Sequence, residues 1–194
     1  MMRIITGRAR GVRLTTLSGE NTRPTSERAK EAIFSTLQFE IDGKEVLDLF
    51  SGSGQMGLEA VSRGASHAVL CDRAKDAIEV IRSNAIKTRL APMCEVLLMD
   101  WEAALRSLRR KRRFDLVFLD PPYSMGVIPA VLERLVDGGL LSDGAKIVCE
   151  SAKEDDVTLE KTQISERFER VRSSRYGAAF VTILQYKETK EAEV

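Results

Sequence analysis

The clearest pattern in the sequence is an alternation of short apolar runs with longer segments in which apolar residues recur every three or four positions. Short apolar runs bounded by turn residues are typical of buried strands, and the longer period is typical of amphipathic helices. The runs that predict strands are EVLDLF (45–50), HAVLCD (67–72), CEVLLMD (94–100), FDLVFLD (114–120) and AKIVCE (145–150). The segments that predict helices are QMGLEAVSRGA (55–65), RAKDAIEVIRSNAIK (73–87), WEAALRSLRR (101–110) and VIPAVLERLVDGG (127–139).

Strands that alternate with helices predict a parallel sheet with helices on both faces. The end of the chain differs, because FERVRSSR (168–175) and AAFVTILQY (178–186) are separated only by Tyr176 and Gly177. That gap leaves no room for a helix, so these two strands are expected to pair antiparallel at one edge. The predicted fold is therefore α/β and Rossmann-like: a mostly parallel sheet of seven strands with an antiparallel edge hairpin.

The first forty residues follow a different pattern. RIITGRARGVRL (3–14) has two short runs separated by glycines, which predicts a small β-hairpin. A loop rich in small polar residues follows, and SERAKEAIFSTL (26–37) then predicts a helix with Thr25 or Ser26 as its N-cap. We expect a basic N-terminal extension over residues 1–20 and one main domain over residues 21–190.

Composition narrows the class of partner. The chain has 194 residues, 43% of them hydrophobic and 30% charged, which suits one soluble domain with a small extension. Its formal net charge is +1, so overall charge does not indicate nucleic acid. Positive charge is instead concentrated in residues 1–14 and in RSLRRKRR (106–113). Each block is either an RNA phosphate contact or a solvated basic surface.

Several kinds of site are disfavoured. The three cysteines, Cys71, Cys94 and Cys149, stand far apart and His67 is the only histidine, which argues against a zinc site or a Cys–His nucleophile. An odd cysteine count without a signal peptide predicts the reducing cytoplasm. No apolar run reaches the roughly 20 residues that span a membrane. We expect a cytoplasmic protein with no metal and no membrane contact.

A glycine-rich loop, DLFSGSGQMG (48–57), joins the first strand of the predicted sheet to its helix. Gly52, Gly54 and Gly57 match the dinucleotide fingerprint GxGxxG, and Asp72 follows the next strand, which favours an NAD-dependent oxidoreductase. Asp48 argues against NAD, because a carboxylate beside the loop disfavours a pyrophosphate. It suits a ligand with a cationic end, such as S-adenosylmethionine, which carries an ammonium and a sulfonium. A tight turn without a ligand is the remaining alternative.

Acids also end the second and third predicted strands. Asp72 is placed to accept from ribose hydroxyls, and Asp100 from the amino group of adenine, with Trp101 beside the ring. Ligands of open α/β sheets lie outside the carboxyl ends of the strands, where these acids gather. For either acid alone the alternative is a helix cap or a first-turn acid, and for Trp101 it is a core position.

The fourth predicted strand ends in DPPY (120–123). In the usual doubly wound order the first and fourth strands are neighbours, so this motif lies beside the glycine loop. The exocyclic amine of a nucleobase is a poor nucleophile, because its lone pair is delocalised into the ring. Asp120 and the carbonyl after it are suited to accept the N–H bonds of that amine, while the two prolines stiffen the backbone. Tyr123 offers a face on which a base can stack.

These motifs carry a resemblance to known families. DLFSGSG followed by DPPY resembles class I S-adenosylmethionine-dependent amino-methyltransferases. RIITGRARGVRL, RPTSERAKEAIFSTL, GLEAVSRGA and the late RYG resemble the small-subunit ribosomal RNA guanine-N2 methyltransferase family, over nearly the whole chain. That family methylates one guanine of bacterial 16S rRNA in the assembling small subunit. DPPY alone is shared with DNA adenine-N6 enzymes, and its NPPY relative with glutamine-N5 protein methyltransferases.

The resemblance implies a class I methyltransferase that moves a methyl group from S-adenosylmethionine to the N2 amine of a guanine in 16S rRNA. The cofactor-binding residues that it implies are Asp48, Phe50, Ser51, Gly52, Ser53, Gly54, Asp72, Arg73, Asp100 and Trp101. The catalytic residues are Asp120, Pro121, Pro122 and Tyr123, and the substrate-binding candidates are Arg10, Arg23, Thr25, Arg28, Arg175 and Tyr176. The second strand of such enzymes often ends in glutamate, whereas this chain has Asp72, which is one methylene shorter.

Two further alternatives stay open at this point. One is an adenine-N6 nucleic-acid methyltransferase, and the other is a non-catalytic RNA-binding factor that assists assembly of the small subunit. The expected partner is 16S rRNA within that assembling subunit, and the protein is expected to be a monomer.

Overall fold

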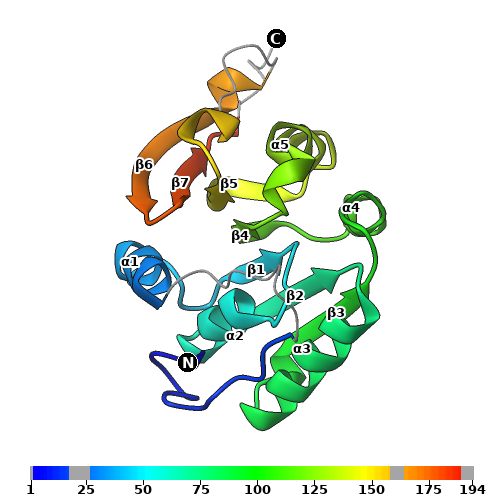
Figure 1. The fold of residues 1–194 in the computed structure, drawn as a ribbon. Coiled ribbons are helices and arrows are strands. Elements are labelled where there is room, and N and C mark those ends of the chain that lie inside the picture. The colour runs from blue at the N-terminus through cyan, green and yellow to red at the C-terminus, as the bar shows by residue number, and fades with distance from the viewer. Residues whose placement is uncertain (1, 18–26, 158–163, 189–194) are drawn as a thin grey trace.

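The computed structural model describes residues 2–17, 27–157 and 164–188. Its centre is a seven-stranded sheet in the order β3-β2-β1-β4-β5-β7-β6 (Figure 1). The strands are β1 (Glu45–Asp48), β2 (His67–Asp72), β3 (Cys94–Leu98), β4 (Phe114–Leu119), β5 (Leu141–Ser151), β6 (Phe168–Tyr176) and β7 (Ala179–Tyr186). The first five run parallel to one another, and β7 pairs antiparallel with both β5 and β6. The predicted sheet, with its antiparallel edge, is confirmed.

Helices cover both faces of this sheet (Figure 1). The helices are α1 (Glu27–Thr36), α2 (Gln55–Ser62), α3 (Lys75–Lys87), α4 (Trp101–Leu108) and α5 (Ile128–Asp137). Single 3₁₀ turns lie at η1 (Ala91–Met93), η2 (Tyr123–Met125), η3 (Glu154–Val157) and η4 (Ser165–Arg167). The apolar stripes of α1, α2 and α3 form one core with one face of the sheet, and those of α4 and α5 form a second core with the other face. Two-sided burial explains why the parallel strands are almost continuously apolar.

The strand order places the two motifs of interest side by side. β1 and β4 are neighbours, with Asp48 opposite Phe118, and the backbone N–H of Leu49 donates to the carbonyl of Phe118 at 3.2 Å. The chain leaves β1 for one side of the sheet and β4 for the other, which makes this the topological switch point. The glycine loop and DPPY therefore meet at the carboxyl edge of the sheet.

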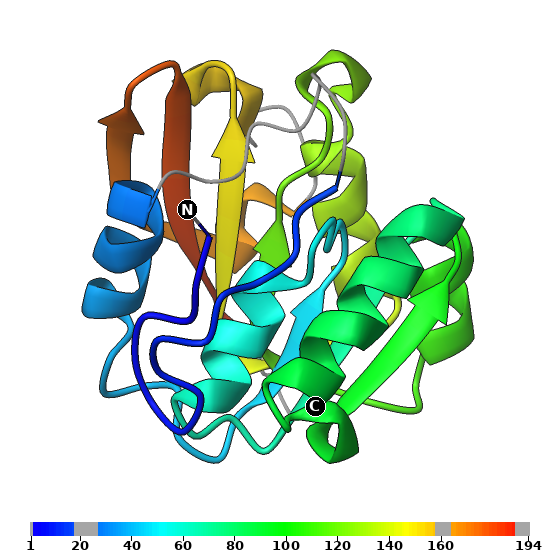
Figure 2. The same ribbon diagram turned by 60° about the horizontal axis from the view of Figure 1, so that its bottom comes forward.

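Residues 2–17, here called the N-terminal arm, fold back across α2 and α3 (Figure 2). The sequence predicts a small hairpin, but the arm has only one antiparallel bridge, between Arg3 and Arg13. Its turn is held against the end of α2, where a Cβ on Gly7 would lie 1.8 Å from the carbonyl oxygen of Ser62. Only glycine fits there, and this close contact replaces a longer strand ladder. The predicted boundary near residue 20 and the predicted cap at residues 25–26 lie outside the described residues.

A buried ionic cluster joins the arm, α1 and α2. The carboxylate of Glu59 has no exposed area and accepts from the backbone N–H groups of Ile5 at 2.7 Å and Thr6 at 3.0 Å. It also pairs with Lys30 at 3.3 Å and with Arg63 at 2.8 Å. The ammonium of Lys30 donates in turn to the carbonyl of Arg3 at 2.6 Å. Each buried charge is therefore matched by an opposite charge and by hydrogen bonds, which its desolvation requires.

Candidate functional site at the carboxyl edge of the sheet

The glycine loop between β1 and α2 is held in a conformation that needs its glycines. Gly52 and Gly54 have positive φ values of 53° and 78°, which disfavour residues with a side chain. The loop closes on itself through a hydrogen bond from the N–H of Gly54 to the carbonyl of Ser51 at 2.7 Å. It is tied to the neighbouring strand by the N–H of Ser51, which donates to the carbonyl of Cys71 at 2.9 Å. The result is a rigid backbone surface without Cβ atoms at two positions.

Asp48 lies beneath this loop and is buried, with 4% of its surface exposed. Its carboxylate accepts from the N–H of Gly57 at 3.0 Å, and the Ser51 hydroxyl donates to its backbone carbonyl at 2.6 Å. Burial raises the pKa of Asp48 to about 7, and the hydrogen bond from Gly57 opposes that rise. A cationic ligand group above the loop would favour the charged carboxylate.

The acid at the end of β2 has two backbone partners. One carboxylate oxygen of Asp72 accepts from the N–H of Gly52 at 2.9 Å, and the other accepts from the N–H of Ala74 at 2.9 Å. Each oxygen keeps a second lone pair, so the carboxylate can still accept from hydroxyl donors. Asp72 therefore fixes one side of the glycine loop as well as facing the carboxyl edge. Arg73, the next residue, is exposed.

Asp100 is the N-cap of α4. Its Oδ1 accepts from the N–H of Ala103 at 2.8 Å, which is the capping alternative that the sequence left open. The residue is exposed, and a carboxylate bonded through one oxygen can still accept from an amino group through the other. Trp101 and Phe50 are both partly buried against the core beneath α4 and α5. The rings of Phe50 and Trp101 therefore pack against this core and stay partly exposed.

The DPPY loop continues directly from β4. Asp120 is half-buried, Pro121 is buried, and Pro122 directly precedes the single turn η2, which begins at Tyr123. The side chain of Tyr123 is 39% exposed, and its hydroxyl donates to a carboxylate oxygen of Glu150 at 3.0 Å. The ring is therefore available on the surface while its far end is fixed.

Glu150 is a site residue that the sequence reasoning missed. It lies at the end of β5, is 7% exposed, and holds the Tyr123 hydroxyl. The signal was present in AKIVCE, an apolar run that ends in an acid like the strands before it. Five consecutive parallel strands thus carry an acid at or just beyond their carboxyl ends.

The structure brings together three of the substrate-binding candidates. Arg28 on α1 and Arg175 and Tyr176 on β6 line an open groove of about 790 Å³, together with Glu31, Ala32, Ser35 and Gly177. The turn between β6 and β7 is at the carboxyl edge, because Phe180 on β7 lies opposite Ser151 at the end of β5. A hydrogen bond of 3.0 Å from Arg172 to the Thr36 hydroxyl ties the hairpin to α1. This α1–hairpin groove therefore opens at the same edge as DPPY.

Other candidates are not brought to that edge. Arg10 is exposed in the turn of the arm, beside Ser62 at the far end of α2. The helix has eight residues, so its ends are roughly 12 Å apart. Arg23 and Thr25 lie outside the described residues.

The second basic block divides into two groups. Arg112 pairs with Glu45 at 3.6 Å and Glu95 at 2.9 Å, and Arg113 pairs with Glu188 at 3.0 Å. These contacts lie at the amino ends of the strands, so this part of the block is neutralised far from DPPY.

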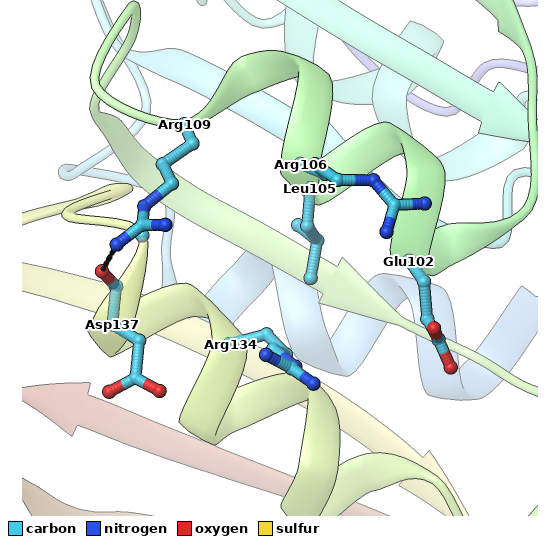
Figure 3. A pocket seen from close by; sticks show the side chains of 7 residues that line it. Glu102, Leu105, Arg106, Arg109, Arg134 and Asp137 are labelled. Carbon is cyan, nitrogen blue, oxygen red and sulfur yellow. Dashed lines mark hydrogen bonds between the residues drawn. The ribbon is translucent and has the colours of Figure 1, made fainter.

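Two arginines from the same block line a groove of about 220 Å³ between α4 and α5, which also contains Arg134 (Figure 3). One of them, Arg109, donates to the backbone carbonyl of Asp137 at 3.4 Å, near the amino edge of the sheet. The other, Arg106, lies one turn closer to the carboxyl edge on α4.

Several other chemistries find no support in the part of the chain that the structure describes. No group of three histidine, cysteine or acidic side chains is arranged to hold a metal ion among these residues. Burial raises the pKa of the Cys71 and Cys94 thiols to about 12, so neither is a thiolate at neutral pH. No helix within the described ranges has the length and apolar character needed to cross a membrane.

Comparison with known proteins places this site in a family. Residues 2–185 match the family model described as conserved hypothetical protein 95. The chain is 38% identical over 154 residues to the putative rRNA methyltransferase YlbH of Bacillus subtilis, covering 79% of this chain and 84% of that protein. It is 34% identical over 155 residues to ribosomal RNA small subunit methyltransferase D of Escherichia coli, covering 79% and 76% respectively.

A solved structure agrees with these sequence matches. The chain superposes on the putative methyltransferase yhhF from Escherichia coli with a TM-score of 0.82 and 28% identity, covering 96% of this chain and 98% of the other. This superposition shows that the two chains share a fold over nearly their whole lengths. The chain therefore belongs to the family described as conserved hypothetical protein 95, the same family as its relatives named ribosomal RNA small subunit methyltransferase D, and has the fold of class I S-adenosylmethionine-dependent methyltransferases.

Proposed function

We propose that this protein transfers a methyl group from S-adenosylmethionine to the exocyclic N2 amine of one guanine in 16S rRNA of the small ribosomal subunit. The observation that carries the proposal is the meeting of the glycine loop and DPPY at the switch point between β1 and β4. A methyl donor on the loop and an amine held by DPPY would be neighbours there. Relatives named as small-subunit rRNA methyltransferases support the RNA substrate.

The residues present fit S-adenosylmethionine. Gly52 and Gly54 let the backbone approach the amino acid part of the cofactor, and the buried Asp48 carboxylate below them suits its ammonium. Asp72 and Asp100 each keep acceptor capacity toward the ribose hydroxyls and the adenine amino group. The cofactor supplies an activated methyl group on a sulfonium, whose positive charge disappears as the methyl leaves.

The protein's contribution to the reaction is chiefly positioning. The Asp120 carboxylate and the following backbone carbonyl accept N–H bonds from the amine and draw its nitrogen toward a tetrahedral shape. Pro121 and Pro122 keep that carbonyl in place. No strong base is needed, because the amine becomes acidic once it is methylated and then gives up its proton easily. The Tyr123 ring, anchored by Glu150, stacks on the base, which has to be flipped out of its helix to enter.

The α1–hairpin groove suits the RNA strand on either side of the flipped base. Arg28 lines it from α1, and Arg175 and Tyr176 line it from β6. The guanidinium of Arg175 is held by the carbonyl of Gly177 at 2.9 Å and lies 5.6 Å from the centre of the Phe180 ring. A pre-positioned guanidinium is a good partner for phosphate, since little side-chain freedom is lost on binding.

The affinity for S-adenosylhomocysteine is expected to depend on pH through Asp48. Because the pKa of this carboxyl is about 7 in the free protein, its charge is lost below that pH. Affinity should fall as pH is lowered from 7.5 to 5.5, approaching about tenfold per pH unit. Isothermal titration calorimetry across this range measures the slope.

Asp48→Asn is the matched control for that titration, because it is close in shape and does not titrate. Its affinity should be weak and independent of pH. The same raised pKa makes the free energy of unfolding depend on pH, because the folded state disfavours ionisation of Asp48. Asp48 does not lower the free energy of unfolding below about pH 4, and it lowers it by the full amount above about pH 7. A pH slope that persists in Asp48→Asn would assign the titration to another group.

Removing the Tyr123 ring is expected to weaken RNA recognition. Tyr123→Ala should lower kcat/KM for the RNA by roughly 5- to 150-fold, the range that corresponds to the loss of one base–aromatic stack. Tyr123→Phe keeps the ring and loses only the bond to Glu150, so its loss should be about fivefold. Steady-state methyl transfer measures both variants, with S-adenosylhomocysteine affinity as the control. Equal losses in the two variants would show that the hydroxyl, rather than stacking, matters.

The proposed function is tested by asking which macromolecule accepts the methyl group. The purified protein is incubated with tritiated S-adenosylmethionine and, separately, with small subunits from cells that lack it, large subunits, duplex DNA and a release factor. We expect label in the RNA of small subunits alone. Label on DNA would indicate the adenine-N6 alternative, and label on the release factor a glutamine methyltransferase. Cofactor binding with no transfer to any acceptor would indicate the non-catalytic assembly factor.

A further inference from the structure

The N-terminal arm reaches the glycine loop. Its two limbs are joined by the N–H of Leu14, which donates to the carbonyl of Met2 at 3.0 Å. Met2 contacts the loop directly, because the Ser53 hydroxyl donates to its sulfur at 3.1 Å. The second limb then passes α2 and α3 near the start of α2, as Figure 2 shows. Thr15 therefore lies close to the loop although it is far from it in the sequence.

A side chain of α3 also connects the arm to the loop. Asn84, on α3, has no exposed surface. Its Oδ1 accepts from the N–H of Thr15 at 2.8 Å, and its Nδ2 donates to the carbonyl of Thr15 at 2.9 Å. The same Nδ2 donates to the carbonyl of Ser53 at 2.9 Å. The amide of Asn84 thus makes all three of these hydrogen bonds with the arm and the loop. None of them is made with its own helix.

This arrangement is unusual for a buried helix position. The neighbouring buried residues on the same side of α3 are apolar, and Asn84 faces the core that they form. An amide in such a place is costly unless its bonds are made, so its presence indicates that these particular partners matter. The glycine loop is then held from two sides, by Asp72 through Gly52 and by Asn84 through Ser53.

We propose that Asn84 is a positioning residue that makes the N-terminal arm part of the cofactor site. The arm and Asn84 together hold Ser53, and through it the loop, in the conformation that receives the cofactor. RNA that orders the arm would therefore strengthen cofactor binding, and the cofactor would strengthen RNA binding by the same factor. The inference rests on the proposed function only for the identities of the cofactor and of the RNA.

The first test measures S-adenosylhomocysteine binding by calorimetry in the absence of RNA. Asn84→Ala is expected to raise the dissociation constant roughly tenfold or more, because the Ser53 carbonyl and the Thr15 backbone lose their buried partner. Thr88→Val is the matched control. Thr88 is also buried, caps the end of α3 one turn beyond Asn84, and its hydroxyl bonds only to the carbonyls of Asn84 and Ala85. This variant should lose stability and keep its affinity within about twofold.

The second test needs no variant to fold. Hydrogen exchange of wild-type protein is followed with and without S-adenosylhomocysteine, at the arm amides of Ile4 and Gly11, which bond only within the arm. Binding at the loop should slow their exchange. In folded Asn84→Ala, the ligand should no longer slow exchange at the amides of Ile4 and Gly11. It should still slow exchange at the Gly52 amide.

These results can overturn the proposal without touching the proposed function. Unchanged affinity in Asn84→Ala, an equal loss in Thr88→Val, or arm amides that ignore the ligand would each show that the amide serves stability alone. The proposed RNA methylation would then still stand. Conversely, a protein that binds S-adenosylhomocysteine through this coupled loop but methylates no RNA would retain the inference and lose the proposed function.

Discussion

Asp120→Ala is expected to lower kcat for methyl transfer by roughly 10²- to 10³-fold, the usual cost of removing one pre-positioned hydrogen-bonding group, while leaving the affinity for S-adenosylhomocysteine within about twofold. The carboxylate follows β4 at the switch point, where it would accept an N–H of the target amine. Without it the nitrogen lone pair stays in the base ring, and the amine has no fixed orientation toward the methyl group. The cofactor loop is held by Asp48, Asp72 and Asn84 instead, so cofactor binding should not change.

Single-turnover transfer with saturating RNA separates the chemical step from RNA binding. Asp120→Asn is the matched variant, because its amide oxygen can still accept one N–H bond and NPPY occurs in related enzymes. It should lose less activity than Asp120→Ala, by about tenfold or more. If Asp120→Ala transfers methyl at nearly the wild-type rate, DPPY is not the place where the amine is held.

Glu59→Ala is expected to destabilise the protein by about 3–5 kcal/mol, the usual cost of leaving a buried charge without its partner. Lys30 is 1% exposed and would keep only the carbonyl of Arg3. The N–H groups of Ile5 and Thr6 would lose their acceptor as well, so the arm should be held less firmly on α2, through Ser62. Urea unfolding measures the change in the free energy of unfolding.

The double variant Lys30→Met with Glu59→Gln is the control for this prediction. It removes the charges of Lys30 and Glu59 and keeps an acceptor for the arm, so it should be more stable than Glu59→Ala alone.

The pH dependence of stability gives a second check. Burial lowers the pKa of Lys30, and the loss of Glu59 should lower it further. Because the folded state then favours the neutral amine, Glu59→Ala should regain stability as pH rises toward 10. A deficit that is the same at pH 7 and pH 10 would show that the lost backbone bonds, and not the charge, dominate.

The sequence predicted the sheet well because its central strands β1, β2 and β4 are buried on both faces and its helices show a clear period. The neighbouring positions of the glycine loop and DPPY followed from the usual strand order, and the structure confirms them. The places of Asp48, Asp72 and Asp100 followed from the same rule, since each acid ends a strand. The sequence could not show whether Asp100 caps a helix or accepts from a ligand. Both roles require an acid at this position, directly after a strand and before a helix.

The contacts between distant segments were beyond the reach of local patterns. Lys30, Glu59 and Asn84 are polar residues in amphipathic helices, and a local pattern does not show which partners such side chains will meet. Those partners include the arm, which is distant in sequence and folds back over α2 and α3. The turn of the arm that carries Arg10 lies at the far end of α2 because of the close contact of Gly7 with Ser62, which no local pattern could predict.

The most direct test of the central claim is the chemical identity of the methylated nucleoside. Small subunits from cells that lack this protein are incubated with it and S-adenosylmethionine, their 16S rRNA is digested to nucleosides, and the products are separated by chromatography and mass spectrometry. We expect N2-methylguanosine, in an amount approaching one per subunit, and far less of it with Asp120→Ala in the same incubation time. N6-methyladenosine, or guanosine methylated on a ring nitrogen, would contradict the assignment of the exocyclic guanine amine as the target.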